Sequence, residues 1–164
     1  MSEPEISGPR PGDLGWLIGL HGRWYADNVG FDGLQFERTV ASIAIDVAAR
    51  LSSPQVNMLV ARDDGGPLAT ISADGEDKDD AGRGHIRIFI AEPRAKGRGL
   101  GQRLVAAALA SLRDGGLPGA YLDTFAGLDA ARAIYLKAGF RLCAEDEGTT
   151  WGSAQREQRY ELDF

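Results

Sequence analysis

The chain has 164 residues, of which 43% are hydrophobic and 26% charged, and this composition is typical of one globular domain rather than of a disordered chain. The net charge of −6 disfavours general binding to nucleic acid or to an anionic membrane. The single cysteine excludes an intrachain disulfide framework and a cysteine-built zinc site, and two histidines are too few for a His-rich metal site. We therefore predict no metal site and a reducing, cytoplasmic location. We expect a single domain over residues 1–164, with no apolar run long enough to span a membrane and no secretory signal in its acidic, Pro- and Gly-rich start.

Hydrophobic periodicity predicts that helices come first and that strands and helices then alternate. The signal Pro11-Gly12-Asp13 precedes a helix around residues 16–25, and apolar residues spaced by three or four predict a second helix over 33–52. The expected later elements are strands 56–61 and 68–72 joined by a hairpin turn, the strong strand 85–90, helix 101–113, strand 120–124, helix 128–138, and strands 140–143 and 159–162. This order predicts an α/β domain with helices packed on a mixed sheet.

Several polar features have a plain structural interpretation. We interpret the acidic run 74–80 as a solvated turn without a function of its own. His85 begins a strand and is expected at its edge, whereas Cys143 is expected in the core. Between Ala81 and Ala110, six basic residues face a single acid, Glu92, which indicates either a local anion site or a solvated loop and helix start.

A glycine-rich turn favours the anion site. Strand 85–90 is followed by Lys96-Gly97-Arg98-Gly99-Leu100-Gly101-Gln102 and then directly by a helix. Glycines let a ligand approach the backbone, and the first N–H groups of a helix are unpaired and lie at its positive end. We therefore expect the six amides at 97–102 to surround a pyrophosphate. The spacing excludes a Walker phosphate loop, and it does not match the G-x-G-x-x-G dinucleotide fingerprint.

Two segments resemble the GNAT superfamily of N-acetyltransferases. The run from Ile88 to Leu104 is similar to its acetyl-CoA motif, [QR]-x-x-G-x-[GA] followed by a helix. The run Ala130–Phe140 is similar to the family element A-x-x-x-Y-x-x-x-G-F, and it lies about thirty residues further on with a strand between. Residues 10–16 and 159–164 also resemble the acetyltransferase half of bacterial chains fused to a MarR-type regulator. The resemblance implies the GNAT acyl-CoA N-acyltransferase fold, with a mixed, mostly antiparallel sheet flanked by helices.

The resemblance also implies a reaction and its residues: acetyl transfer from acetyl-CoA, without a metal, to the primary amine of a small molecule or peptide. Tyr135 would be the general acid. The general base would be Asp123 or a chain of water molecules that leads to the solvent, and Trp24 or Tyr25 would touch the acceptor. The loop around Trp151 would flank the pocket mouth. The backbone of Ile88, Phe89 and Ile90 would lie along the pantetheine arm, and the cofactor's pyrophosphate would be held by Lys96, Gly97, Arg98, Gly99, Leu100, Gly101 and Gln102.

Three positions depart from the family pattern. Lys96 stands where the motif has Gln or Arg, although Arg94 spells the same motif two residues earlier. Leu128 replaces an asparagine that many members carry, and Asp123 is one methylene shorter than the glutamate of ribosomal-protein acetyltransferases. These departures keep a second hypothesis open, namely a non-catalytic acyl-CoA-binding module of the same fold. A nucleotide-binding domain is a third and is disfavoured by the motif spacing; a homodimer through the C-terminal strands is also possible.

Overall fold

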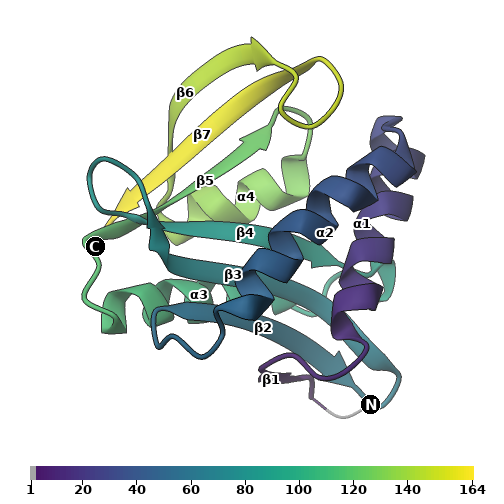
Figure 1. The fold of residues 1–164 in the computed structure, drawn as a ribbon, viewed down its shortest axis with the longest axis horizontal. Helices are drawn as coiled ribbons and strands as arrows, with labels where there is room; N and C mark the ends of the chain where they lie inside the picture. Colours follow the sequence, from purple (N-terminus) through teal and green to yellow (C-terminus); the bar gives the residue numbers. More distant parts are fainter. Residues whose placement is uncertain (1–2) are drawn as a thin grey trace.

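The computed structural model describes residues 3–164, which form one seven-stranded sheet with helices on both faces (Figure 1). The helices are α1 (Asp13–Val29), α2 (Gly33–Ala49), α3 (Leu100–Asp114) and α4 (Asp129–Ala138), with a short 3-10 turn, η1 (Pro93–Ala95). The strands are β1 (Glu5–Ser7), β2 (Val56–Asp63), β3 (Gly66–Lys78), β4 (Gly84–Ala91), β5 (Gly119–Phe125), β6 (Arg141–Gly148) and β7 (Gln155–Asp163). They lie in the order β1-β2-β3-β4-β5-β7-β6, and every neighbouring pair except β4–β5 is antiparallel.

Two apolar clusters hold the helices to the sheet. Helices α1 and α2 cover one face through a cluster that includes Leu17, Phe36 and Val47, whereas α3 and α4 cover the other face through a cluster that includes Leu104 and Tyr135 (Figure 1). Each cluster is the apolar stripe of an amphipathic helix buried against strand side chains. The sheet is therefore the middle of three layers.

The two parallel strands separate along their length. β4 and β5 pair only at Gly84 with Ala120 and at His85 with Tyr121, near the start of both strands. Beyond that point the register between β4 and β3 is interrupted by a bulge, in which Ile88 has φ 55°. A positive φ is a strained conformation for a β-branched residue and costs about 1–3 kcal/mol. The sheet consequently opens between β4 and β5 toward their carboxyl ends.

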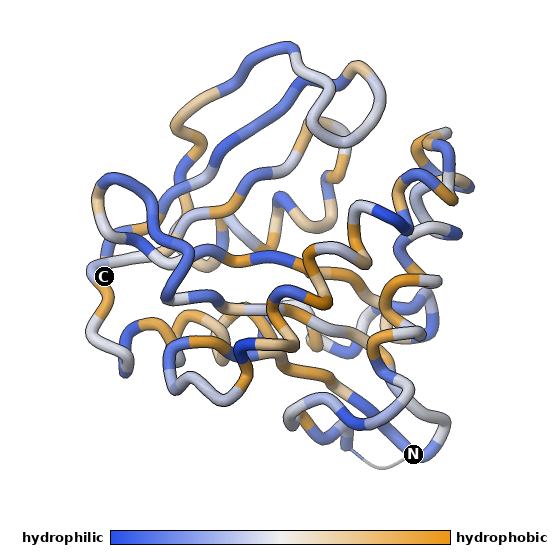
Figure 2. Tube along the Cα trace, viewed as in Figure 1, coloured by the Kyte–Doolittle hydropathy of each residue, from blue (hydrophilic) through white to orange (hydrophobic). Residues whose placement is uncertain are grey.

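The predicted elements are confirmed, with differences at three places. The run 74–80 is not a solvated turn, because β3 continues through Lys78 and Asp74 is fully buried there. Cys143 is exposed rather than in the core, since β6 is a mostly exposed strand of a hydrophilic hairpin (Figure 2). Strand β1 carries no pattern long enough to have been predicted. None of the helices between residues 3 and 164 is long and apolar enough to cross a bilayer.

Candidate active site

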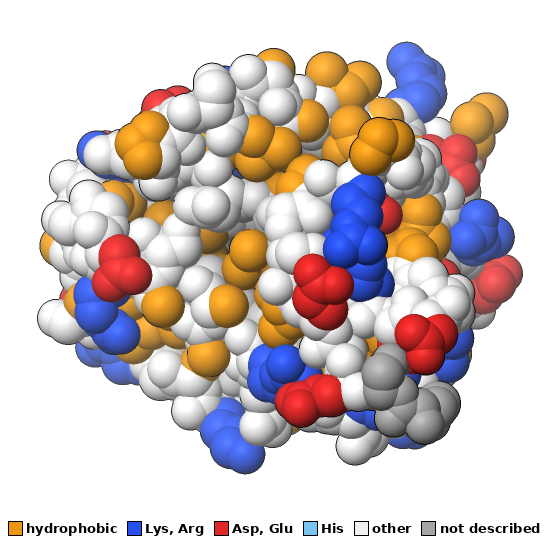
Figure 3. Space-filling view, turned by 90° about the horizontal axis from the view of Figure 1, so that it is seen from below, with side chains coloured by type: hydrophobic (Ala, Val, Ile, Leu, Met, Phe, Trp, Pro, Cys, Tyr) orange, Lys and Arg blue, Asp and Glu red, His pale blue; other side chains and the backbone are white. Residues whose placement is uncertain are grey.

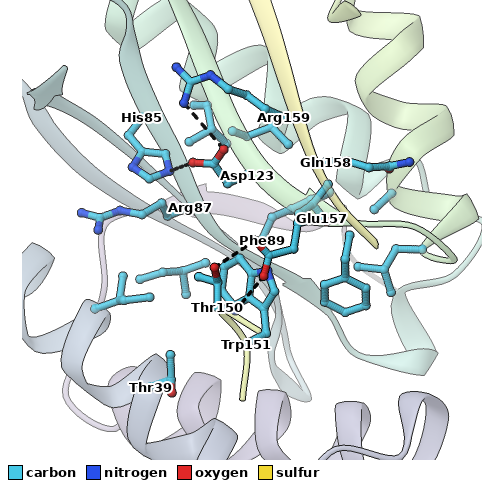
Figure 4. A pocket seen from close by; sticks show the side chains of 18 of the residues that line it. Thr39, His85, Arg87, Phe89, Asp123, Thr150, Trp151, Glu157, Gln158 and Arg159 are labelled. Carbon is cyan, nitrogen blue, oxygen red and sulfur yellow. Dashed lines mark hydrogen bonds and ion pairs between the residues drawn. The ribbon is translucent and has the colours of Figure 1, made fainter. Parts of the chain in front are cut away.

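A cavity of about 530 Å³ occupies the opening between β4 and β5. Its walls come from both faces of the sheet: Phe36 and Ile43 of α2 on one side, and Ala131 and Tyr135 of α4 on the other. Strand residues from β4, β5 and β7 line the middle of it, as Figure 4 shows for His85, Phe89, Asp123 and Arg159. Two ligands that approach from opposite faces of the sheet could therefore meet inside this cavity.

The glycine-rich turn presents free amides at the start of α3. Gly97 and Gly99 have φ of 78° and 68°, values that glycine adopts without strain, and Gly99 is the N-cap residue of α3. Within residues 3–164, no acceptor lies within hydrogen-bond reach of the N–H groups of Gly97, Gly99, Leu100, Gly101 and Gln102. The amide of Arg98 differs from the expectation, because it donates to the Ala95 carbonyl at 3.3 Å. Five of the six expected amides are thus available to an anion.

Gly101 has a second role. A Cβ atom built on Gly101 would lie 2.6 Å from Ile134 Cδ1 and 3.2 Å from Phe89 Cζ. The third glycine of the motif therefore lets α3 pack closely against α4 and against β4. Gly97 and Gly99 are different, because a Cβ on either would meet open space and only their φ values require glycine.

Most of the expected basic patch is internally neutralised. Arg94 and Arg98 both bind Asp63, at 2.9 and 2.7 Å, and these two bonds, Arg98 first, lower the pKa of Asp63 far below its ordinary value. Lys96 is exposed and has no partner among the described residues. On the face seen from below, Lys and Arg side chains lie beside Asp and Glu and form no continuous positive area (Figure 3). Main-chain amides and Lys96 are thus the donors left for an anion at this turn.

Tyr135 lies in the cavity wall on the α4 side. Tyr135 is only 7% exposed, and its ring lies 5.8 Å from the ring of Phe89 and 6.0 Å from those of Phe140 and Tyr160. Burial raises the pKa of Tyr135 well above its ordinary value of 10.0. No described residue accepts a hydrogen bond from its hydroxyl. Tyr135 is therefore protonated at neutral pH and has a hydrogen bond to offer.

Asp123 projects into the same cavity from β5, between two cationic or titratable groups. Its Oδ2 is 3.7 Å from His85 Nε2, and its Oδ1 is 3.6 Å from Arg159 Nη1 (Figure 4). The Asp123 side chain is 45% exposed, so a ligand can reach it. The expectation that His85 lies at a strand edge is wrong, because β4 is interior to the sheet and His85 lines the cavity.

On the α1–α2 side, the cavity has an aromatic wall, and only one of the two residues expected to touch an acceptor belongs to it. Tyr25 lines the cavity, with its ring 4.4 Å from Phe36, and burial raises its pKa to about 12. Trp24 packs edge-on against Tyr25 at 4.9 Å and does not line the cavity. Trp151 does line it, and its loop is fixed by Glu157, which accepts hydrogen bonds from the amide and hydroxyl of Thr150 at 2.6 and 2.9 Å.

Residues that the sequence did not single out complete this end of the cavity. Asp77 binds His85 Nδ1 at 2.8 Å, and Arg159 lies over the ring of Tyr121 at 4.2 Å. The alternation of β4 could have indicated His85 and Arg87 as neighbours on one face. Asp77 could not be found this way, because the irregular register between β3 and β4 near residues 74–78 sets its position. In the described part of the chain, no group of three or more His, Cys, Asp and Glu side chains is arranged to hold a metal ion.

The open sheet, the free amides and the cavity through the sheet define the class as a GNAT-type acetyltransferase fold. The family model described as Acetyltransferase (GNAT) family matches residues 27–140. Because this match covers more than half of the chain, the protein belongs to the GNAT acetyltransferase family. A search of curated proteins found no match.

Solved structures share this fold over nearly the full chain. A PaiA N-acetyltransferase from Thermoplasma acidophilum in complex with coenzyme A is 18% identical, with a TM-score of 0.77 and 100% of each chain covered. A putative acetyltransferase, yncA, from Salmonella typhimurium with acetyl-CoA is 16% identical, with a TM-score of 0.76 over 99% of this chain and 94% of that one. A ribosomal-protein-alanine N-acetyltransferase from Brucella melitensis is 17% identical, with a TM-score of 0.75 over 98% and 99%. At these identities the likeness concerns the fold.

Proposed function

We propose that this protein transfers the acetyl group of acetyl-CoA directly to a primary amine. The observation that carries the proposal is the run of free amides at the start of α3, next to a cavity that opens through the sheet. Membership of the GNAT family supports the use of an acyl-CoA, and two structural neighbours contain acetyl-CoA or coenzyme A.

The residues present fit coenzyme A. The free N–H groups of Gly97, Gly99, Leu100, Gly101 and Gln102 would hold its pyrophosphate, because they lie at the positive end of a fifteen-residue helix. Exposed Lys96 is next to them in the chain. The backbone of Ile88, Phe89 and Ile90 would lie along the pantetheine arm, since the bulge at Ile88 turns this part of β4 away from regular pairing with β3.

The cavity residues fit the chemistry of amine acetylation. When bound, acetyl-CoA supplies an activated acetyl group at the thioester. An alkyl ammonium, with a pKa of about 10.4, must lose a proton before its nitrogen can attack. Asp123 offers a carboxylate that can meet this ammonium inside the cavity. Tyr135 would donate a hydrogen bond and then its proton to the departing sulfur. Protonation is favoured there because a thiolate is poorly stabilised where water is excluded.

The test is turnover of acetyl-CoA with a panel of primary amines. Release of coenzyme A should be followed by chromatography, because the exposed Cys143 would itself react with thiol reagents. Amine-dependent release supports the proposal. Tight binding of acetyl-CoA without release in any member of a broad panel would instead indicate a non-catalytic acyl-CoA-binding module.

The role of Tyr135 is tested by Tyr135→Phe, which removes the hydroxyl and keeps the ring. We expect kcat to fall about a hundredfold, the usual range for a lost general acid. Tyr160→Phe is a matched control, because Tyr160 is fully buried 6.0 Å away, bonds Gln158 and does not line the cavity. An unchanged kcat of Tyr135→Phe at every pH would remove the assignment.

A further inference from the structure

The side chains at the closed end of the opening, where β4 and β5 still pair, form a small polar site within the cavity. His85 and Tyr121 are the last paired residues of the two strands, and their rings stack at 4.2 Å. Asp123 lies two residues further along β5, and His85 and Asp123 both line the cavity. A titratable imidazole and a carboxylate thus face the cavity together, which is a combination suited to binding a substrate and moving a proton.

Asp77 fixes both the orientation and the tautomer of His85. Its Oδ2 is 2.8 Å from His85 Nδ1, so Nδ1 carries the proton and donates it, because a carboxylate can only accept. In the neutral ring, Nε2 then presents its lone pair to the cavity. Nε2 and Asp123 Oδ2 are 3.7 Å apart, too far for a hydrogen bond to each other. Two acceptors therefore face each other across a gap without a donor among the described residues.

A primary ammonium has the shape and charge that this gap lacks. Its nitrogen can lie at a hydrogen-bond distance of about 2.8 Å from both Nε2 and Oδ2, since two such bonds easily span the 3.7 Å between them. The third N–H remains free for water, and the fourth bond of the nitrogen joins it to the alkyl body. We propose that the acceptor's primary amine is seated between His85 and Asp123, and that His85 Nε2 takes its proton. This inference rests on the proposed acetyl transfer.

Other charged side chains surround this pair of acceptors. Arg159 lies on the far side of Asp123, with Nη1 3.6 Å from its Oδ1, and Arg87 Nη1 lies 3.6 Å from Asp77 Oδ2. Both guanidiniums bind other carboxylates more closely, Arg159 to Asp79 at 2.8 Å and Arg87 to Asp74 at 2.9 Å, so neither is committed to neutralising Asp123 or Asp77. Asp123 is assigned to bind the amine and His85 to deprotonate it, because Asp77 stabilises the imidazolium that His85 becomes when it takes the proton.

The proton balance of the step is complete within these groups. One N–H bond of the ammonium breaks and its proton moves to His85 Nε2, so that the nitrogen regains a lone pair. The nitrogen forms a bond to the thioester carbonyl carbon, and the C–S bond breaks with its electron pair on sulfur. Tyr135 gives its proton to that sulfur and is later reprotonated from solvent, as His85 returns its proton and the amide nitrogen loses its remaining extra proton to water.

His85 is set to be neutral where it must act. Burial lowers its pKa below the ordinary 6.5, and the hydrogen bond that Nδ1 donates to Asp77 only partly compensates. The groups that face it are Asp77 from β3, Arg87 from its own strand, Tyr121 and Asp123 from β5 and, through Asp123, Arg159 from β7. An ammonium substrate would thus meet a neutral imidazole throughout the neutral pH range.

The test is the pH profile of kcat/KM in wild type, His85→Gln and Asp77→Asn, with a simple alkyl monoamine that wild type turns over. In wild type, kcat/KM should fall only at low pH, along a limb whose midpoint lies below pH 6.5. His85→Gln should lose this limb and about a hundredfold in kcat, and its rate should rise with pH toward the pKa of the free amine. Asp77→Asn should shift the limb to lower pH, because Asp77 raises the pKa of His85.

Two outcomes separate this inference from the proposed function. If no amine is turned over, the proposed function fails and this inference fails with it. If wild type turns over amines but His85→Gln binds acetyl-CoA and keeps both rate and pH limb, only the seat at His85 is overturned. Calorimetric binding of acetyl-CoA shows whether each variant is folded. If His85→Gln does not fold, Asp77→Asn decides the matter: an acid limb at the same pH as in wild type would overturn the inference.

Discussion

Asp74→Asn is expected to destabilise the protein by about 3 kcal/mol. Asp74 is fully buried and accepts bonds from Arg50 Nη2 at 2.6 Å, Arg50 Nη1 at 3.0 Å and Arg87 Nη2 at 2.9 Å. It also accepts the amides of Glu76 and Asp77 at 3.0 and 3.1 Å. An asparagine keeps the volume but leaves two guanidiniums without their shared carboxylate, and loss of one partner of a buried ion pair costs about 3–5 kcal/mol. We expect the lower end, because Arg50 remains partly exposed.

The effect should depend on pH in a defined direction. Burial raises the pKa of Asp74, but the hydrogen bonds from Arg50 and from two amides outweigh it and lower the pKa from 3.8 to about 2. A lowered pKa gives stability that is present above the unfolded value near 3.8 and is lost as the pH falls through the folded value. The shift corresponds to about 2 kcal/mol at pH 7, of which about 1 kcal/mol is lost by pH 3.

The assay is urea unfolding of wild type and Asp74→Asn at pH 7 and pH 3, with the difference in unfolding free energy as the readout. That difference should be about 1 kcal/mol smaller at pH 3. Asp46→Asn is the matched control, because Asp46 binds the same Arg50 at 2.6 Å but is 57% exposed, and it should cost less than about 1 kcal/mol. A pH-independent difference, or one no larger than that of Asp46→Asn, would refute the reasoning.

Three further predictions concern the turn and the cavity. Gly101→Ala should lower the unfolding free energy by about 1–3 kcal/mol and weaken acetyl-CoA binding, measured by urea unfolding and calorimetry, because its Cβ would meet Ile134 and Phe89; unchanged stability would contradict the packing role. Asp63→Asn should release Arg94 and Arg98 and make coenzyme A binding more salt-dependent in a calorimetric titration, and an unchanged salt dependence would contradict it. Trp151→Ala should raise the KM for the amine more than that for acetyl-CoA in steady-state kinetics, whereas an equal rise in both would place Trp151 elsewhere in the reaction.

Local sequence patterns sufficed for most of the fold because they are set by local physics. The apolar spacing of residues 36–51 buries one face of α2, and the turn 63–66 joins β2 to β3 as expected. The glycine-rich turn was placed correctly because positive φ at Gly97 and Gly99 is a local requirement. Cys143 was misplaced because its strand is paired on one side only, at the end of the sheet order, where alternation does not report burial.

The polar end of the cavity was beyond such patterns because tertiary contacts create it. Asp74 and Asp77 belong to an acidic run that is typical of a solvated turn, yet β3 carries both into contact with basic side chains from other elements. His85 has no neighbour in sequence that marks it, and its position depends on the parallel pairing of β4 with β5. The neutralisation of Arg94 and Arg98 by Asp63 depends likewise on where the β2–β3 turn meets the start of α3.

The most direct measurement is a titration of the ¹⁵N-labelled protein with coenzyme A, followed by the amide resonances of the turn. The account predicts that the signals of Gly97, Gly99, Leu100, Gly101 and Gln102 move strongly, while that of Arg98, already bonded to Ala95, moves less. Binding that leaves these five resonances in place and shifts residues elsewhere would contradict it.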